Sequence, residues 1–136
     1  MTASARAVAA LRSPHNWIQL AKFSIVGLSG YVINLAVYAA LLGIGAHKAA
    51  AISFVVAAAN NYWWNRVWTF AKERGAFAYQ GMRFFVVAVA GWIVNQLWLF
   101  VFLDTMGLGK IVSQAIAIIL VTPLNFLGNK LWSFRL

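Results

Sequence analysis

Four long apolar stretches dominate this 136-residue chain and limit what it can fold into. They run from about Phe23 to Ile44, Ala49 to Phe70, Phe84 to Met106 and Ile111 to Trp132. A helix needs about 20 mainly apolar residues to cross a bilayer. Only 10% of the residues are charged, against about a quarter in soluble domains. We therefore predict an all-α integral membrane protein with four transmembrane helices, in a single membrane domain over residues 1–136.

The expected layout is two helix pairs joined by a charged segment. Residues 1–20 form a cytoplasmic or interfacial N-terminal segment, residues 21–70 the first pair, residues 71–82 a cytoplasmic link and residues 83–136 the second pair. The first apolar stretch exceeds the roughly 7–15 residues of a signal-peptide core. We therefore expect it to be retained as a spanning helix.

The basic residues predict the orientation in the membrane. Nine of the eleven fall on one side of the predicted spans, which by the positive-inside rule is the cytoplasmic side; Lys48 and Lys110 fall on the other. Both termini are therefore expected in the cytoplasm, with Trp68 and Trp132 at the inner interface, where indole rings are favoured. The nine are Arg6, Arg12, Lys22, Arg66, Lys72, Arg74, Arg83, Lys130 and Arg135.

The two helix pairs repeat one another in sequence. The first helix of each pair opens with K/R-F-x-x-V-[GA], from Lys22 and from Arg83, an offset of 61 residues. The second ends with N-x-x-x-N-[RK]-x-W-[TS]-F, from Asn61 and from Asn125, an offset of 64. Two spans return the chain to its starting side, so we expect two parallel repeats related by an axis along the membrane normal, with a substrate path at their interface.

Polar side chains within the predicted spans form a candidate substrate path. Residues four apart share a helix face, so each ending presents a pair of asparagines that continues outward as a row of small residues. At about 1.5 Å per residue, another matched asparagine pair lies near the midplane. An ordinary alternative is that these amides bond neighbouring helices and that the basic residues reach lipid phosphates. The six asparagines are Asn34, Asn61, Asn65, Asn95, Asn125 and Asn129.

Composition excludes several other functions. The chain has no cysteine, two histidines and two acids, Glu73 and Asp104, so we expect no metal site, no cofactor and no catalytic centre. The basic residues alternate with apolar runs rather than forming a polar face, which excludes nucleic-acid binding. The predicted spans lack a deep carboxylate, which disfavours a proton-coupled cation exporter. Amides, guanidinium and ammonium groups instead suit an anionic ligand such as a sugar phosphate.

The paired repeats and the N-[RK]-x-W-[TS]-F endings resemble the GtrA-like family, from about Lys22 to Phe134. The resemblance implies a multi-pass protein of the bacterial inner membrane that flips polyprenyl-phosphate-linked monosaccharides to the outer leaflet for cell-surface polysaccharide or O-antigen glycosylation. It also implies a partner polyprenyl-phosphate glycosyltransferase. The alternative is a non-transporting scaffold that recruits this enzyme, and a small cation exporter is a third hypothesis. Gly27, Gly30 and Gly91 are interpreted as packing glycines.

The site assignments follow from chemistry rather than from the family. Arg66 and Lys130 are expected to receive the phosphate, with Lys22 and Arg83 at the entrance. The asparagines near the inner ends would bond phosphate or sugar, and Asn34 and Asn95 would carry the midplane crossing. Four helices enclose little volume, so we expect a homo-oligomer.

Overall fold

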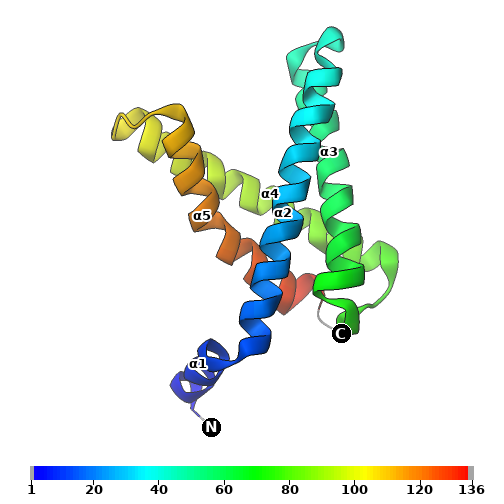
Figure 1. The fold of residues 1–136 in the computed structure, drawn as a ribbon, viewed down its shortest axis with the longest axis vertical. Helices are drawn as coiled ribbons and strands as arrows, with labels where there is room; N and C mark the ends of the chain where they lie inside the picture. Colours follow the sequence, from blue (N-terminus) through cyan, green and yellow to red (C-terminus); the bar gives the residue numbers. More distant parts are fainter. Residues whose placement is uncertain (1, 135–136) are drawn as a thin grey trace. The chain divides into compact units, whose positions relative to one another are not determined.

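The computed structural model describes residues 2–134, except for the side chains of Ala46, His47, Lys110 and Ile111. Within this part of the chain every regular element is helical (Figure 1). The all-α prediction is therefore confirmed. Two basic residues used to predict the orientation, Arg135 and the side chain of Lys110, lie outside the described part.

Five α-helices form the framework, and three of them end in a π-helical segment. The 3-10 turns Leu42–Ile44 and Ala71–Glu73 follow the second and third helices. The π-helical segments η2 (Asn65–Thr69), η4 (Phe100–Thr105) and η5 (Asn129–Ser133) continue α3, α4 and α5 without a break. The α-helices are α1 (Ala3–Arg12), α2 (Pro14–Ala40), α3 (Ala46–Trp64), α4 (Phe77–Leu99) and α5 (Lys110–Gly128).

Among the described residues, three helical segments are long and apolar enough to cross a membrane. They are Pro14–Ala40, Phe77–Thr105 and Val112–Ser133, with mean hydropathies of 1.6, 2.0 and 1.4. Large apolar side chains on all three are exposed, for example Leu28 by 65% and Ile119 by 68%. Such long exposed apolar surfaces are unusual on soluble monomers and fit a lipid environment.

Helix α3 does not belong to this group of apolar segments. Its N-terminal half is apolar, but its second half and η2 carry Asn60, Asn61, Asn65 and Arg66. These polar residues lower the hydropathy of the segment. Asn61, Asn65 and Arg66 are among the residues that the sequence predicts to bind substrate.

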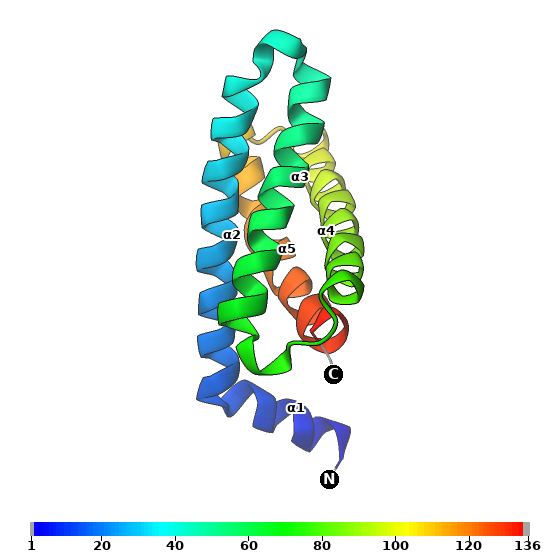
Figure 2. The same cartoon turned by 90° about the vertical axis from the view of Figure 1, so that its right-hand side faces the viewer.

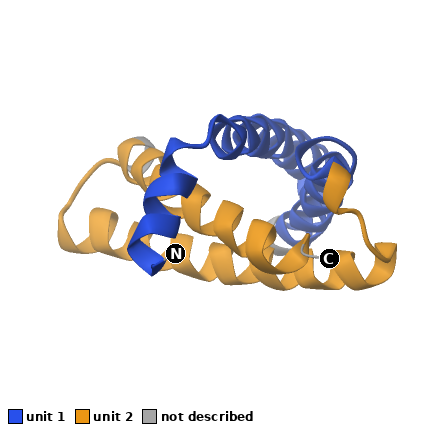
Figure 3. Ribbon diagram, turned by 90° about the horizontal axis from the view of Figure 1, so that it is seen from below, with its two compact units in different colours: residues 1–71 blue, residues 72–136 orange. Residues whose placement is uncertain are grey.

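The chain divides into two compact units, Met1–Ala71 and Lys72–Leu136 (Figure 3). In each unit two long helices run side by side as an antiparallel pair: α2 with α3 in the first (Figure 2), α4 with α5 in the second (Figure 1). Helix α4 begins at Phe77, so the second half of the predicted link at 71–82 is helical.

Each pair packs along the predicted row of small residues. Every fourth residue of α3 from Ala49 is turned away from solvent, and the corresponding row of α5 starts at Ser113. Small side chains let neighbouring helices approach closely in a membrane. The buried members of the two rows are Ala49, Ser53, Ala57 and Asn65 in α3 and η2, and Ser113, Ala117, Val121 and Asn129 in α5 and η5.

Helix α1 joins α2 through a hydrogen-bonded corner at Ser13 and Pro14. Ser13 is the N-cap residue of α2 and Pro14 its first residue, a position where proline's missing N–H costs nothing. Asn16 Nδ2 donates to the Ala10 carbonyl at 2.9 Å, and Trp17 Nε1 donates to the Leu11 carbonyl at 2.6 Å. Side chains of α2 thus satisfy the last carbonyls of α1, and Figure 2 shows α1 running across the direction of α2.

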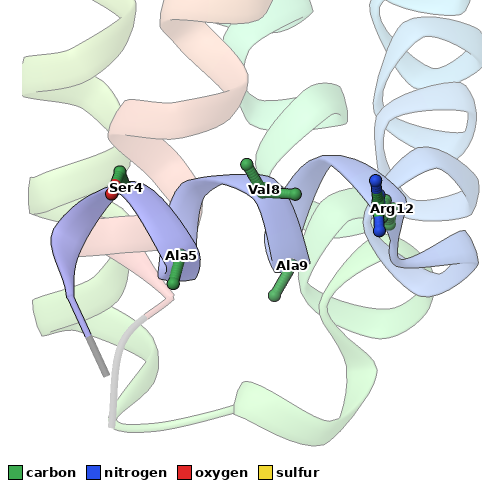
Figure 4. Close-up of a pocket in the computed structure, with 5 residues that line it drawn as sticks. All are labelled: Ser4, Ala5, Val8, Ala9 and Arg12. Carbon is green, nitrogen blue, oxygen red and sulfur yellow. The ribbon is translucent and has the colours of Figure 1, made fainter.

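A depression on α1 is lined by five side chains from that helix alone (Figure 4). Three of them, Ser4, Val8 and Arg12, lie along one row four residues apart, and Ala5 and Ala9 lie beside it. No residue of α1 is buried. A single exposed helix face does not enclose a ligand, so we assign no binding site there.

Candidate functional site

The repeated N-x-x-x-N-[RK]-x-W-[TS]-F endings adopt the same backbone in both units. In each, the α-helix changes to a π-helix at the second asparagine, Asn65 in η2 and Asn129 in η5. Each π segment is closed by a 2.8 Å bond from the final phenylalanine, Phe70 N to Asn65 O and Phe134 N to Asn129 O. Short π-helical segments within α-helices occur frequently at functional sites.

Each ending also buries polar atoms without hydrogen-bond partners among the described residues. These atoms are Asn65 Oδ1 and Thr69 Oγ1 in unit 1, and Asn129 Oδ1 and Ser133 Oγ in unit 2. A buried acceptor or hydroxyl left without a partner costs about 1–3 kcal/mol. The same cost therefore occurs at equivalent positions of both units. A ligand that supplies partners for these atoms would remove it.

The structure adds a matched pair of glutamines that the sequence interpretation missed. Gln19 and Gln80 are each 97% buried, with 3% of their surface exposed. Gln19 Nε2 donates to the Thr69 carbonyl at 3.4 Å, and Gln80 Nε2 donates to the Glu73 carbonyl at 2.7 Å. They are 61 residues apart, the offset that relates Lys22 to Arg83, so extending the repeat three residues upstream would have found them.

The first asparagine of each ending lies against a glycine of the partner helix. A Cβ added to Gly30 would lie 2.7 Å from Asn61 Cγ, and one added to Gly91 would lie 2.7 Å from Asn125 Cγ. A larger residue at either position would force the asparagine amide to shift. Gly30 and Gly91 are therefore packing glycines. The same interpretation is wrong for Gly27, whose added Cβ would meet no described heavy atom within 4 Å.

The basic residues of unit 1 lie beside aromatic rings. Lys22 Nζ stands 5.3 Å from the centre of the Trp68 ring, a cation–π distance. Arg66 Nη1 donates to Tyr62 Oη at 3.3 Å. Lys22 and Arg66 are half-buried, while Trp68 is exposed. Two of the predicted residues, Lys22 and Trp68, are thus brought into contact.

Unit 2 holds its basic residues differently. Arg83 Nη1 donates to the Trp132 carbonyl at 2.9 Å, and Nη2 donates to Tyr79 Oη at 2.6 Å. The guanidinium also lies over the Tyr79 and Trp132 rings, at 4.2 and 5.5 Å from their centres. Lys130 Nζ lies 5.8 Å from the centre of the Phe126 ring.

The predicted midplane asparagines are half-buried. Asn95 Nδ2 donates to Gln114 Oε1 on α5 at 3.4 Å, which links the two helices of unit 2. Asn34 lies one turn after Gly30 on α2, on the side of the helix that carries Val26 and Gly30. Gln114 is a third polar residue that the sequence interpretation did not select.

These features describe a small helical membrane protein with two matched polar helix ends. The model of the GtrA/DPMS transmembrane-domain family matches residues 22–134, so the chain belongs to that family. The resemblance stated from the repeated motifs is thereby confirmed.

Two curated proteins are similar over most of the chain. The uncharacterized membrane protein YngA of Bacillus subtilis is 31% identical over 117 residues, which cover 85% of this chain and 78% of YngA. The dolichol-phosphate mannosyltransferase of Pyrococcus furiosus is 29% identical over 117 residues, 82% of this chain. The present chain matches only 32% of that mannosyltransferase.

Proposed function

We propose that the protein flips a polyprenyl-phosphate-linked monosaccharide from the cytoplasmic to the outer leaflet of the bacterial inner membrane, for cell-surface polysaccharide or O-antigen glycosylation. The main supporting observation is that the two repeated helix endings, from Asn61 and from Asn125, both bury polar atoms that have no hydrogen-bond partner among the described residues. Family membership supports the ligand class, because a relative's name joins an isoprenoid phosphate to a sugar.

The unpartnered atoms suit the hydroxyl groups of a sugar. Asn65 Oδ1 and Asn129 Oδ1 accept hydrogen bonds, and the hydroxyls of Thr69 and Ser133 can donate or accept. Each hydroxyl of a sugar can likewise donate and accept a hydrogen bond. Because these atoms are covered in the structure, the sugar would reach them when a π-helical end loosens from its partner helix.

The proposed membrane layout has four spans, with both termini in the cytoplasm and the two units as parallel repeats. Helix α3 with η2 provides the fourth span, because its helical stretch from Ala46 to Thr69 exceeds the roughly 20 residues needed. Arg66 and Lys130 would receive the phosphate, and Asn61 and Asn125 would continue the path outward.

We propose further that transport proceeds down the substrate gradient and without catalysis. The sequence supplies no acid deep within the proposed spans for coupling to protons, since Glu73 and Asp104 lie at helix ends. A homo-oligomer would provide the volume that four helices do not enclose. A polyprenyl-phosphate glycosyltransferase would load the sugar on the cytoplasmic side.

Substitution of the midplane pair tests transport directly. Asn34→Ala with Asn95→Ala is preferable to the Asn65 and Asn129 pair, because the former residues are only half-buried and their removal disturbs packing less. We expect the double variant to lose transfer of labelled polyprenyl-phosphate sugar in proteoliposomes by tenfold or more. Gln96→Ala, an exposed amide beside Asn95, is the matched control and should keep its rate.

Unchanged transfer by a folded Asn34/Asn95 double variant would remove these amides from the mechanism. Absence of transfer by the wild-type chain would favour the alternative function, a scaffold that recruits a glycosyltransferase. That alternative is supported by the match to about a third of a mannosyltransferase. It predicts that scrambling segment 72–76 of the predicted link abolishes recruitment of the enzyme.

A further inference from the structure

Unit 2 contains a groove beside its polar helix end. The groove has a volume of about 470 Å³ and lies between the first turns of α4 and segment η5. Arg83 is the charged side chain among the residues that line it. These residues are Gly75, Ala76, Tyr79, Gln80, Arg83, Leu131 and Trp132.

The guanidinium of Arg83 is held in a fixed orientation in this groove. Its bonds to Tyr79 Oη at 2.6 Å and to the Trp132 carbonyl at 2.9 Å use two different nitrogens. A guanidinium has five N–H donors, so this arrangement leaves donors for an oxyanion. The planar fork matches the oxygens of a phosphate group, and prior orientation reduces the entropy lost on binding.

The wall of the groove matches the apolar part of a lipid. Leu131 is 62% exposed, and the rings of Tyr79 and Trp132 are also partly exposed. A phosphate bound at Arg83 would place its attached hydrocarbon chain along this surface. Gln80, which is buried, also lines the groove.

Unit 1 lacks the residues that orient the cation. The 61-residue offset places Ile18 at the position of Tyr79 and Lys22 at that of Arg83. Isoleucine has no hydroxyl to accept a bond from the cation, and a lysine ammonium has no bidentate fork. Lys22 instead lies over the Trp68 ring. The groove chemistry therefore belongs to unit 2 rather than to the repeat in general.

We propose that the Tyr79–Arg83–Trp132 groove is the first binding site for the phosphate of an isoprenoid phosphate lipid, and that unit 2 loads the substrate. The proposal rests on the proposed function but concerns binding rather than transfer. The same phosphate chemistry occurs in ordinary membrane phospholipids, so the test must separate the two sources.

Native mass spectrometry of the full-length protein in detergent measures this binding. The probes are polyprenyl phosphate, its monosaccharide-linked form and phosphatidylglycerol. Arg83→Lys and Tyr79→Ile introduce the unit 1 residues, and each should weaken polyprenyl phosphate binding by about tenfold. Tyr79→Phe keeps the ring and removes only the hydroxyl, so it retains the fold if Tyr79→Ile does not, and it should weaken binding severalfold.

Two matched controls lie in the same region of the chain. Lys72→Gln removes an exposed positive charge, and Phe77→Ile replaces an exposed aromatic residue of the same helix turn; neither residue lines the groove. Both should bind polyprenyl phosphate within about twofold of wild type. If the controls lost as much polyprenyl phosphate binding as Arg83→Lys, the proposal would be overturned. The loss would then reflect net charge or general hydrophobicity rather than the groove.

The outcomes separate the groove from the flippase. Wild-type binding that Arg83→Lys and Tyr79→Phe leave unchanged overturns the groove alone. Binding that depends on these residues without transfer in proteoliposomes supports the groove and overturns flipping. Equal affinity for phosphatidylglycerol, with the same dependence on Arg83, would show a general lipid-phosphate contact and overturn substrate loading. Failure of the wild-type chain to bind either isoprenoid lipid would overturn both.

Discussion

The two helix pairs can be compared residue by residue at the ends that carry the repeated motif: their buried residues agree, and their more accessible residues differ. Both bury a glutamine, an asparagine and a hydroxyl residue, and both seat an asparagine amide on a glycine. Outside this buried set, unit 2 has the exposed Tyr79 and the half-buried Arg83 where unit 1 has Ile18 and Lys22.

This difference indicates which constraints act on the two units. The buried contacts depend on a close approach of two helices, where a change in one side chain requires a change in its partner. Exposed positions carry no such restriction, so they can differ in what they bind. We infer that the shared interior maintains the helix pairs, while the differing surface gives each unit a separate task.

The largest expected effect tests whether the interiors are equivalent. Gly30→Ala and Gly91→Ala each place a methyl group onto an asparagine amide, so each should lower the free energy of unfolding by about 1–3 kcal/mol. Thermal unfolding in detergent measures the loss. Gly27→Ala, with no described atom near its added Cβ, is the control and should be neutral or slightly stabilising.

Equal losses for Gly30→Ala and Gly91→Ala would support equivalent packing in the two units. A loss of stability in one unit alone would mean that the asparagine amide of the other unit can rotate away from the added methyl group. The two units would then not be equivalent at their closest helix–helix contact.

The second prediction transfers the surface chemistry of unit 2 to unit 1. Ile18→Tyr with Lys22→Arg supplies the hydroxyl and the guanidinium, and we expect a second molecule of polyprenyl phosphate to bind. The affinity of unit 1 for polyprenyl phosphate should rise severalfold, by about 1 kcal/mol, without reaching that of unit 2. The reason is that Pro14 and His15 replace the smaller Gly75 and Ala76. Native mass spectrometry counts the bound lipids. A stoichiometry unchanged from wild type would mean that the two side chains do not suffice.

The third prediction uses the difference between the two buried glutamines. Gln80 Nε2 donates over 2.7 Å and Gln19 Nε2 over 3.4 Å, so the hydrogen bond of Gln80 is the stronger one. We expect Gln80→Leu to lower the free energy of unfolding by about 1 kcal/mol and Gln19→Leu by less. Chemical denaturation in the same detergent measures the free energy of unfolding of both variants. A larger loss for Gln19→Leu would mean that Gln19, rather than Gln80, contributes more to stability.

Much of this arrangement could be predicted from the sequence. Apolar length predicted the helices, and i, i+4 spacing predicted the buried row that includes Ser53 and Ala117. The repeated endings predicted the family. These features depend on local periodicity and on matching residues, both of which a sequence displays directly.

The remaining features depend on how a helix is rotated against its partner. Spacing alone did not show that Gly30 meets an amide while Gly27 does not, although Gly30 recurs as Gly91 and Gly27 is replaced by Ala88. The change from α- to π-helix at Asn65 and Asn129 has no sequence signal in this chain. The orienting role of Tyr79 was missed because residues 71–82 were predicted to form a cytoplasmic link rather than the start of a helix.

The smallest expected effect concerns the unpartnered hydroxyls of the two endings. Thr69→Val removes a buried hydroxyl that has no partner among the described residues and keeps the side-chain shape. We expect the free energy of unfolding to rise by up to about 1 kcal/mol. Ser133→Ala should gain less, because it leaves a small void. If the hydroxyls serve the sugar, both variants should transfer lipid-linked sugar more slowly while unfolding at higher temperature. A loss of stability in both variants would mean that these hydroxyls have protein partners, and the polar helix ends would then be packing contacts rather than a substrate path.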